Sequence, residues 1–135
     1  MDDNSSLLEL DKIISHWIES SDDDYSTMIK LFDSKSYSWS LFVGHIVIEK
    51  LLKAVFVKKH KKHAPLIHNL YRLAELNEIE MSNEQADMLF QITTFNINTK
   101  YDDYKNKFHL KCTKEFTLEW IEKIKTVRLW IKKML

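Results

Sequence analysis

The run from Tyr37 to Lys59 (YSWSLFVGHIVIEKLLKAVFVKK) constrains the fold more than any other part of the chain. If this run is a helix, its apolar residues point in nearly every direction, and a helix that is apolar almost all round is a buried one. The sequence therefore predicts a central, buried helix. One side would carry Leu41, Ile48, Leu52 and Val55, and another Val43, Val47, Leu51 and Ala54.

Three polar residues interrupt this helix: His45, Glu49 and Lys53, which we call the polar seam. Their spacing of four residues places them on one helix face, where they can pair along it. In a structural interpretation, Lys53 neutralises Glu49 and His45 donates a hydrogen bond to it, because a lone buried charge is very costly.

The composition indicates an all-α protein with one domain over residues 1–135. One glycine and one proline are too few for a turn-rich β-architecture, and 135 residues suit a single core. The formal net charge of zero gives no overall attraction to nucleic acid or membrane, although residues 50–63 form a basic patch.

The chain also carries signals of its compartment. Cys112 is the only cysteine, so no intrachain disulfide is expected. The acidic N-terminus does not resemble a signal peptide, and no apolar run is long enough to span a membrane. We expect a cytoplasmic protein that does not bind membranes.

Helical periodicity and capping signals define the remaining elements. Residues 33–36 are a short polar connection, so the first two helices should be antiparallel. Residues 98–111 lose the apolar periodicity and are predicted to be a loop that carries a site. The first three predicted helices are residues 7–32, 37–59 and 68–76. A fourth helix begins after a cap formed by Ser82 and Gln85 and extends to about residue 97. A fifth begins after the cap Thr113 and extends to Met134.

Two further features have an ordinary and a functional interpretation. Gly44 indicates either close packing of a neighbouring helix or the approach of a ligand to the backbone. The basic run 58–63 (KKHKKH) either complements the helix dipole or holds a phosphate. We favour the ordinary interpretation of both, and we expect no metal site, because His60, His63 and His68 lack cysteine or carboxylate partners at ligand spacing.

Four segments, in order, resemble the minimal HEPN family (higher eukaryotes and prokaryotes nucleotide-binding domain). The resemblance covers residues 17–135. Its pieces are the first two helices with the H-x-x-x-E-x-x-x-K seam, the entry to the third helix (HAPLIHNLYRLAEL) with Pro65, His68 and Leu70, the segment FNINTKYDDYKNKF, and the closing helix from Thr113. The chain departs from the family pattern at Lys100, where the family has arginine, and at Asp102 or Asp103, where it has proline.

The resemblance implies an up-down four-helix bundle with an additional short helix. It also implies a homodimer, a small nucleotidyltransferase as protein partner, and a site between the central and fourth helices. On this basis we predict seven ligand-binding residues, with His45, Lys53 and Lys100 holding a nucleotide phosphate and Tyr101 or Tyr104 stacking on the base. The seven are His45, Glu49, Lys53, His68, Lys100, Tyr101 and Asp102.

Ribonucleases of this family use an arginine followed after four to six residues by a histidine. The arginine is a cation for the phosphate, and the histidine is an imidazole for acid–base chemistry. Arg72 and Arg128 are the only arginines, and neither has a histidine at that distance. We therefore predict no catalytic residues and no cofactor, and RNA is not the favoured ligand. The predicted function is a non-catalytic nucleotide-binding or protein-interaction module, and the alternative is a toxin–antitoxin component with an altered ribonuclease site.

Overall fold

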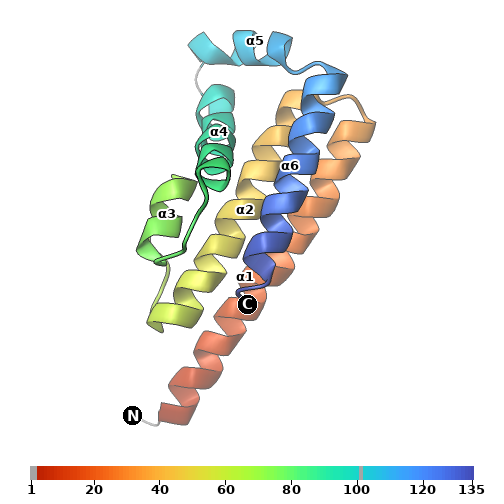
Figure 1. Cartoon of the computed structure of the whole chain (residues 1–135). Helices are drawn as coiled ribbons and strands as arrows, with labels where there is room; N and C mark the ends of the chain where they lie inside the picture. Colours follow the sequence, from red (N-terminus) through yellow and green to blue (C-terminus); the bar gives the residue numbers. More distant parts are fainter. Residues whose placement is uncertain (1–2, 101) are drawn as a thin grey trace.

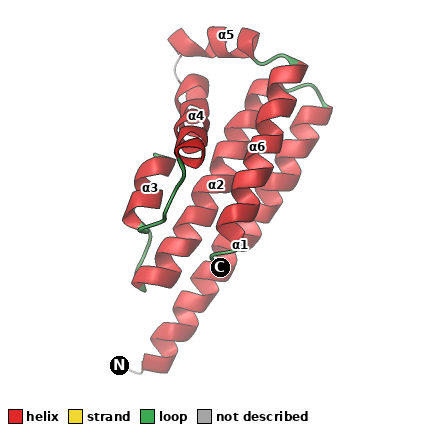
Figure 2. Ribbon diagram, in the orientation of Figure 1, coloured by secondary structure: helices red, strands yellow, loops and turns green. Residues whose placement is uncertain are grey.

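The computed structural model describes the backbone of residues 3–100 and 102–135, and the side chains of residues 6–98 and 104–135. Throughout this part of the chain the regular elements are helices, with no strand (Figure 2), so the all-α prediction is confirmed. The six helices are α1 (Asp3–Asp33), α2 (Tyr37–His60), α3 (Leu70–Leu76), α4 (Asn83–Lys100), α5 (Asp102–Lys111) and α6 (Lys114–Lys132).

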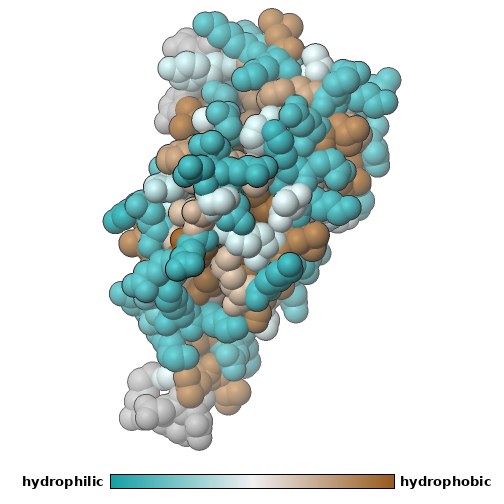
Figure 3. Space-filling model, viewed as in Figure 1, coloured by the Kyte–Doolittle hydropathy of each residue, from teal (hydrophilic) through white to brown (hydrophobic). Residues whose placement is uncertain are grey.

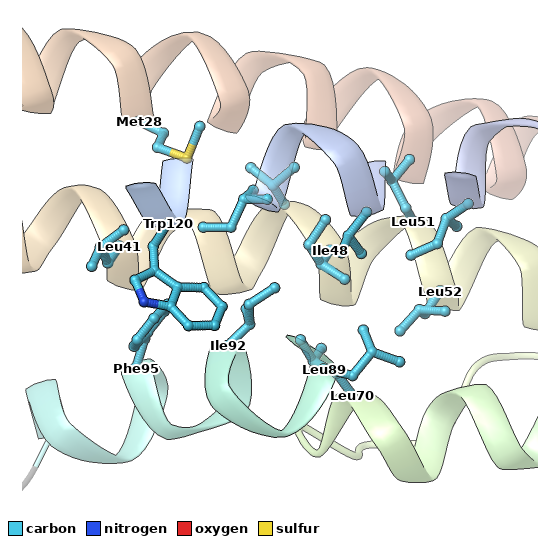
Figure 4. Packing of buried hydrophobic residues seen from close by; sticks show 14 of the residues in the cluster. Met28, Leu41, Ile48, Leu51, Leu52, Leu70, Leu89, Ile92, Phe95 and Trp120 are labelled. Atoms are coloured by element: carbon cyan, nitrogen blue, oxygen red, sulfur yellow. The ribbon is translucent and has the colours of Figure 1, made fainter. Parts of the chain in front are cut away.

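Four long helices form the bundle, with α2 at its centre and α1, α4 and α6 around it (Figure 1). The short α3 lies beside the lower half of α2, and α5 lies across the opposite end. The core is one cluster of apolar side chains (Figure 4), to which α2 contributes the most. Hydrophilic residues cover most of the visible surface, with small apolar areas between them (Figure 3).

Capping residues mark the starts of three helices, and those of α4 and α6 are the residues that the sequence predicted. Ser82 Oγ accepts a hydrogen bond from Gln85 N at 3.1 Å, and Gln85 Oε1 accepts one from Ser82 N at 2.9 Å, which completes a capping box before α4. Thr113 Oγ1 accepts from Phe116 N at the start of α6. Asn69 caps α3 in the same way.

The prediction of a loop over residues 98–111 is wrong. The helix α4 continues to Lys100, and α5 follows from Asp102 to Lys111. Only Phe108 of the described α5 side chains is buried, at 3% exposed, so no repeating apolar stripe exists for a periodicity argument to detect. The helix is instead favoured by residues with good intrinsic propensity, such as its lysines and Leu110.

Polar side chains tie α1 to α2 at several levels. Ser21 Oγ donates to the carbonyl oxygen of Val47 at 2.8 Å, and Ser40 Oγ donates to that of Met28 at 2.8 Å. Lys50 adds a third tie through the carboxylate of Asp24. Because each bond joins one specific level of α1 to one of α2, the set fixes the axial register of the antiparallel pair.

Gly44 is explained by close packing, the interpretation that we favoured from the sequence. A Cβ atom at this position would lie 2.5 Å from Ile124 Cδ1 of α6 and 3.0 Å from Met28 Sδ of α1. Three helices therefore meet at this point, and the glycine lets α6 approach α2.

We expect Gly44→Ala to lower the free energy of unfolding by about 1 kcal/mol. Overpacking costs about 2 kcal/mol, and the better helix propensity of alanine returns about 1 kcal/mol. Chemical denaturation measures the difference. The control is Ile124→Val, which removes the Cδ1 atom; in that background the same substitution should be neutral or stabilising. A Gly44→Ala protein more stable than the parent would contradict the packing explanation.

Candidate functional site

The polar seam centres on the carboxylate of Glu49. Lys53 Nζ donates to Glu49 Oε2 at 3.0 Å, and His68 Nδ1 donates to Oε1 at 2.8 Å. His45 Nε2 lies 3.8 Å from Oε1, an ion-pair distance rather than a hydrogen bond. The structure thus brings together four of the seven predicted residues, with His68 in the hydrogen-bonding role that we had assigned to His45.

His45 holds the backbone of the segment that precedes α3. Its Nε2 donates to the carbonyl oxygen of His68 at 2.8 Å, so His68 is fixed through its main chain by His45 and through its ring by Glu49. The His45 side chain is only 1% exposed, whereas that of His68 is 57% exposed. The seam therefore reaches solvent mainly at the His68 ring.

Lys53 is enclosed on two sides. Its Nζ lies 5.7 Å from the centroid of the Trp17 ring on α1, in addition to its contact with Glu49, and its side chain is 6% exposed. An indole face stabilises a nearby ammonium group electrostatically. Lys53 is thus engaged by a carboxylate and an aromatic ring, and a phosphate would have to compete with both.

Glu49 stays ionised at neutral pH. Burial raises the pKa of its carboxyl, but the hydrogen bonds from His68 and Lys53, together with the charges of Lys53 and His45, outweigh burial and hold the pKa below its ordinary value. The seam is therefore a cluster in which a buried negative charge is compensated by basic groups. This arrangement supports the structural interpretation of the seam.

This lowered pKa predicts a pH dependence of folding. A carboxyl whose pKa is lower in the folded than in the unfolded state stabilises the fold at pH values above its pKa in the unfolded state. This stability is lost as the pH falls through its pKa in the folded state. We expect the free energy of unfolding to fall as the pH drops below 4.5, the ordinary pKa of Glu49. Asp22, whose pKa is also lowered, contributes in the same direction.

Urea denaturation between pH 7 and pH 3 measures this effect, with Glu49→Gln as the matched variant. The variant should lose part of the acid sensitivity and keep the part that comes from other carboxyls. If its pH profile runs parallel to that of the parent, the pKa of Glu49 does not differ between the two states.

The remaining three predicted site residues cannot be placed against the seam. Tyr101 and the side chains of Lys100 and Asp102 lie outside the described part of the chain. Tyr104, the alternative stacking residue, is on α5 and is 53% exposed.

The two arginines have carboxylate partners, and the thiol of Cys112 is buried. Arg128 Nη2 lies 3.1 Å from Asp22 Oδ1, and Arg72 Nη1 lies 3.6 Å from Glu75 Oε1. Burial raises the pKa of Cys112 to about 12, which leaves it a protonated, unreactive thiol. Within the described residues, no group of three or more His, Cys, Asp or Glu side chains could hold a metal ion, and no helix could cross a membrane.

The first three residues of the basic run 58–63 contact carbonyl oxygens near the C-terminal ends of two other helices. Lys58 Nζ donates to the carbonyl oxygen of Leu135 at 2.8 Å, Lys59 Nζ to that of Asn77 at 2.5 Å, and His60 Nε2 to that of Leu76 at 3.1 Å. These carbonyls are at or just beyond the C-terminal ends of α3 and α6, where positive charge is favourable. These contacts are with α3 and α6 rather than with the end of α2, whose dipole the ordinary interpretation invoked, so that interpretation stays a prediction.

Sequence reasoning missed an incompletely covered stripe on the first half of α2. Trp39 is 46% exposed, and Phe42, Val43 and Ile46 are half-buried. Their spacing of i, i+3, i+4 and i+7 places them on one helix face, as in helices that pair with another helix. We call this set the α2 stripe; the sequence could not reveal it because apolar residues occur all round this helix.

Comparisons with known proteins agree with the fold. The crystal structure of TT1696 from Thermus thermophilus is similar, with a TM-score of 0.77 over 90% of this chain and 98% of that chain, at 13% sequence identity. At this identity the likeness shows the fold alone. No curated protein matches the sequence. A family model described as "HEPN domain" matches residues 14–134. Since this match spans nearly the whole chain, the protein belongs to the HEPN domain family.

Proposed function

We propose that this protein is a non-catalytic HEPN domain that works as a protein-interaction module, assembled as a homodimer through the α2 stripe. The observation that carries the proposal is the stripe itself: Trp39, Phe42, Val43 and Ile46 form a helix-pairing pattern on a face that the bundle leaves partly open. Exposed apolar patches of this kind mark contact surfaces. A second copy is the favoured occupant because one stripe can pair with another about a two-fold axis.

The polar seam supports this function over nucleotide binding. A phosphate site needs cations free to approach the ligand, but Lys53 contacts Glu49 at 3.0 Å and Trp17 at 5.7 Å, and is 6% exposed. Of the two arginines, Arg128 pairs with Asp22 and Arg72 with Glu75. A nucleotide would have to break such contacts before it could use these charges.

The dimer is tested by sedimentation equilibrium. We expect a dimer at micromolar concentration, and a monomer for Trp39→Ser/Phe42→Ser. Each apolar side chain removed from an interface costs about 1.5 kcal/mol or more, so the two together should weaken association by at least about a hundredfold. The matched control is Leu118→Ser/Leu129→Ser on α6, where the side chains are 44% and 50% exposed. A monomeric parent, or equal effects of the two double variants, would contradict the proposal.

The protein partner that we propose beyond the second copy is a small nucleotidyltransferase, by analogy with the family. Co-expression followed by size-exclusion chromatography tests it, with the α2 stripe variant as comparison. The nucleotide-binding alternative is tested separately: thermal unfolding with each ribonucleotide should show no shift. A ligand at a hundred times its dissociation constant would add about 2.7 kcal/mol, which such a measurement detects. A shift that Lys53→Met abolishes would restore the nucleotide site.

A further inference from the structure

A hollow between α4 and α6 carries chemistry that the proposed function does not use. Its volume is about 420 Å³, within the range of small-ligand sites, and none of its lining residues belongs to the α2 stripe. The helices α4 and α6 that form its walls both face the viewer in Figure 1. The lining residues are Glu84, Asp87, Met88, Gln91, Trp120 and Lys123.

The aromatic wall of the hollow already holds an ammonium group. Lys123 Nζ lies 4.4 Å from the centroid of the Trp120 ring, the geometry of a close cation–π contact. The ring itself is held edge-on to Phe95, with 5.4 Å between the centroids and 83° between the planes. Trp120 is 9% exposed with Lys123 over its ring, so a ligand cation reaches the indole face only when Lys123 leaves it. The internal cation shows which kind of group this face accepts.

The opposite wall is acidic. Glu84 and Asp87 are both exposed on the first turns of α4, and within the described residues neither makes an ion pair closer than 4.0 Å. Lys123 instead pairs along its own helix with Glu119, at 3.2 Å. The two carboxylates thus line the same hollow as a cation-accepting ring, without an internal partner for their charge.

We propose that this hollow binds an organic cation, an alkylammonium or an alkylguanidinium group. The cation lies on the Trp120 face and donates hydrogen bonds to Glu84 and Asp87, while its alkyl chain contacts Met88. Lys123 can leave the ring without losing its charge partner, since Glu119 is four residues away on the same helix. Two sources have this chemistry: a free polyamine, and a lysine or arginine side chain of a protein partner.

Nuclear magnetic resonance of the intact protein tests the site, with spermidine and Nα-acetyl-arginine amide as probes in 0.15 M salt. The Met88 methyl signal and the Trp120 indole N–H signal should shift together and saturate. The double variant Glu84→Gln/Asp87→Asn should weaken binding by about tenfold or more, because hydrogen bonds to charged groups are the strong ones. Lys123→Met should strengthen it, because the competing internal cation is gone.

The matched control is Glu78→Gln/Glu80→Gln, which makes the same change of net charge in the loop before α4. This variant should bind within about twofold of the parent, since charges outside the hollow are largely screened. Binding of spermidine alone would assign the hollow to a free polyamine, and binding of the arginine derivative alone to a side chain of a partner. The proposal is overturned if neither probe saturates, if the control variant loses as much affinity as Glu84→Gln/Asp87→Asn, or if Lys123→Met weakens binding.

Discussion

Lys53→Met should lower the free energy of unfolding by about 3 kcal/mol, the lower end of the range for removing one partner of a buried ion pair. The substitution keeps the length of the side chain but leaves the Glu49 carboxylate, 11% exposed, without its ammonium partner at 3.0 Å. His68 and His45 would then be the remaining basic neighbours. Urea denaturation measures the change.

Two further variants make this result specific to the buried pair. Lys50→Met changes a lysine on the same helix whose ammonium contacts Asp24, but where the side chains are 22% and 27% exposed, so the expected loss is about 1 kcal/mol. Glu49→Leu/Lys53→Met removes both charges and should recover most of the stability, because an apolar pair can replace a buried ion pair. If Lys53→Met costs no more than Lys50→Met, the seam is hydrated and the structural interpretation fails.

Phe108→Ala should release α5 from the bundle. Phe108 is 3% exposed and stacks on Phe95 with 5.5 Å between the ring centroids, whereas every other described α5 side chain is exposed. Truncation of a buried phenylalanine costs about 3 kcal/mol or more. Since this one side chain provides the buried contact of the helix, the substitution should lower the free energy of local unfolding of α5 and leave that of α2 nearly unchanged.

Hydrogen exchange measured for each helix tests this expectation. Amides of α5 should exchange at least about a hundredfold faster in Phe108→Ala, while those of α2 change little, because local openings differ in free energy from global unfolding. The control is Leu110→Ala on the same helix, where the side chain is 79% exposed and the expected change is below about 0.5 kcal/mol. Equal acceleration in α2 and α5 would mean that Phe108 stabilises the whole bundle rather than the docking of one helix.

The sequence predicted the long helices because their signals are local. Apolar periodicity and the capping residues Ser82, Gln85 and Thr113 depend only on neighbours a few positions away. The same reasoning failed for α5, because Phe108 is the one buried side chain among its described residues and a single residue shows no apolar periodicity. The position of a helix with one buried side chain depends on the surface against which that side chain packs, and the local sequence pattern does not contain this information.

In the candidate site, too, some contacts follow from the local sequence and others depend on tertiary packing. The pairing of Glu49 with Lys53 follows from their spacing of four residues on one helix. The hydrogen bond from His68 depends on how the segment after Pro65 returns across α2, which no periodicity specifies. The open face of α2 and the hollow beside Trp120 likewise depend on where other helices stop, so they become visible only in three dimensions.

The hydrogen bonds between α1 and α2 oppose sliding within the hairpin. Apolar contacts are less directional than hydrogen bonds, and a slip of even one turn would break both the bond from Ser21 to Val47 and the bond from Ser40 to Met28. The two helices therefore keep one axial register. A displacement of α1 along its axis would move α2 with it.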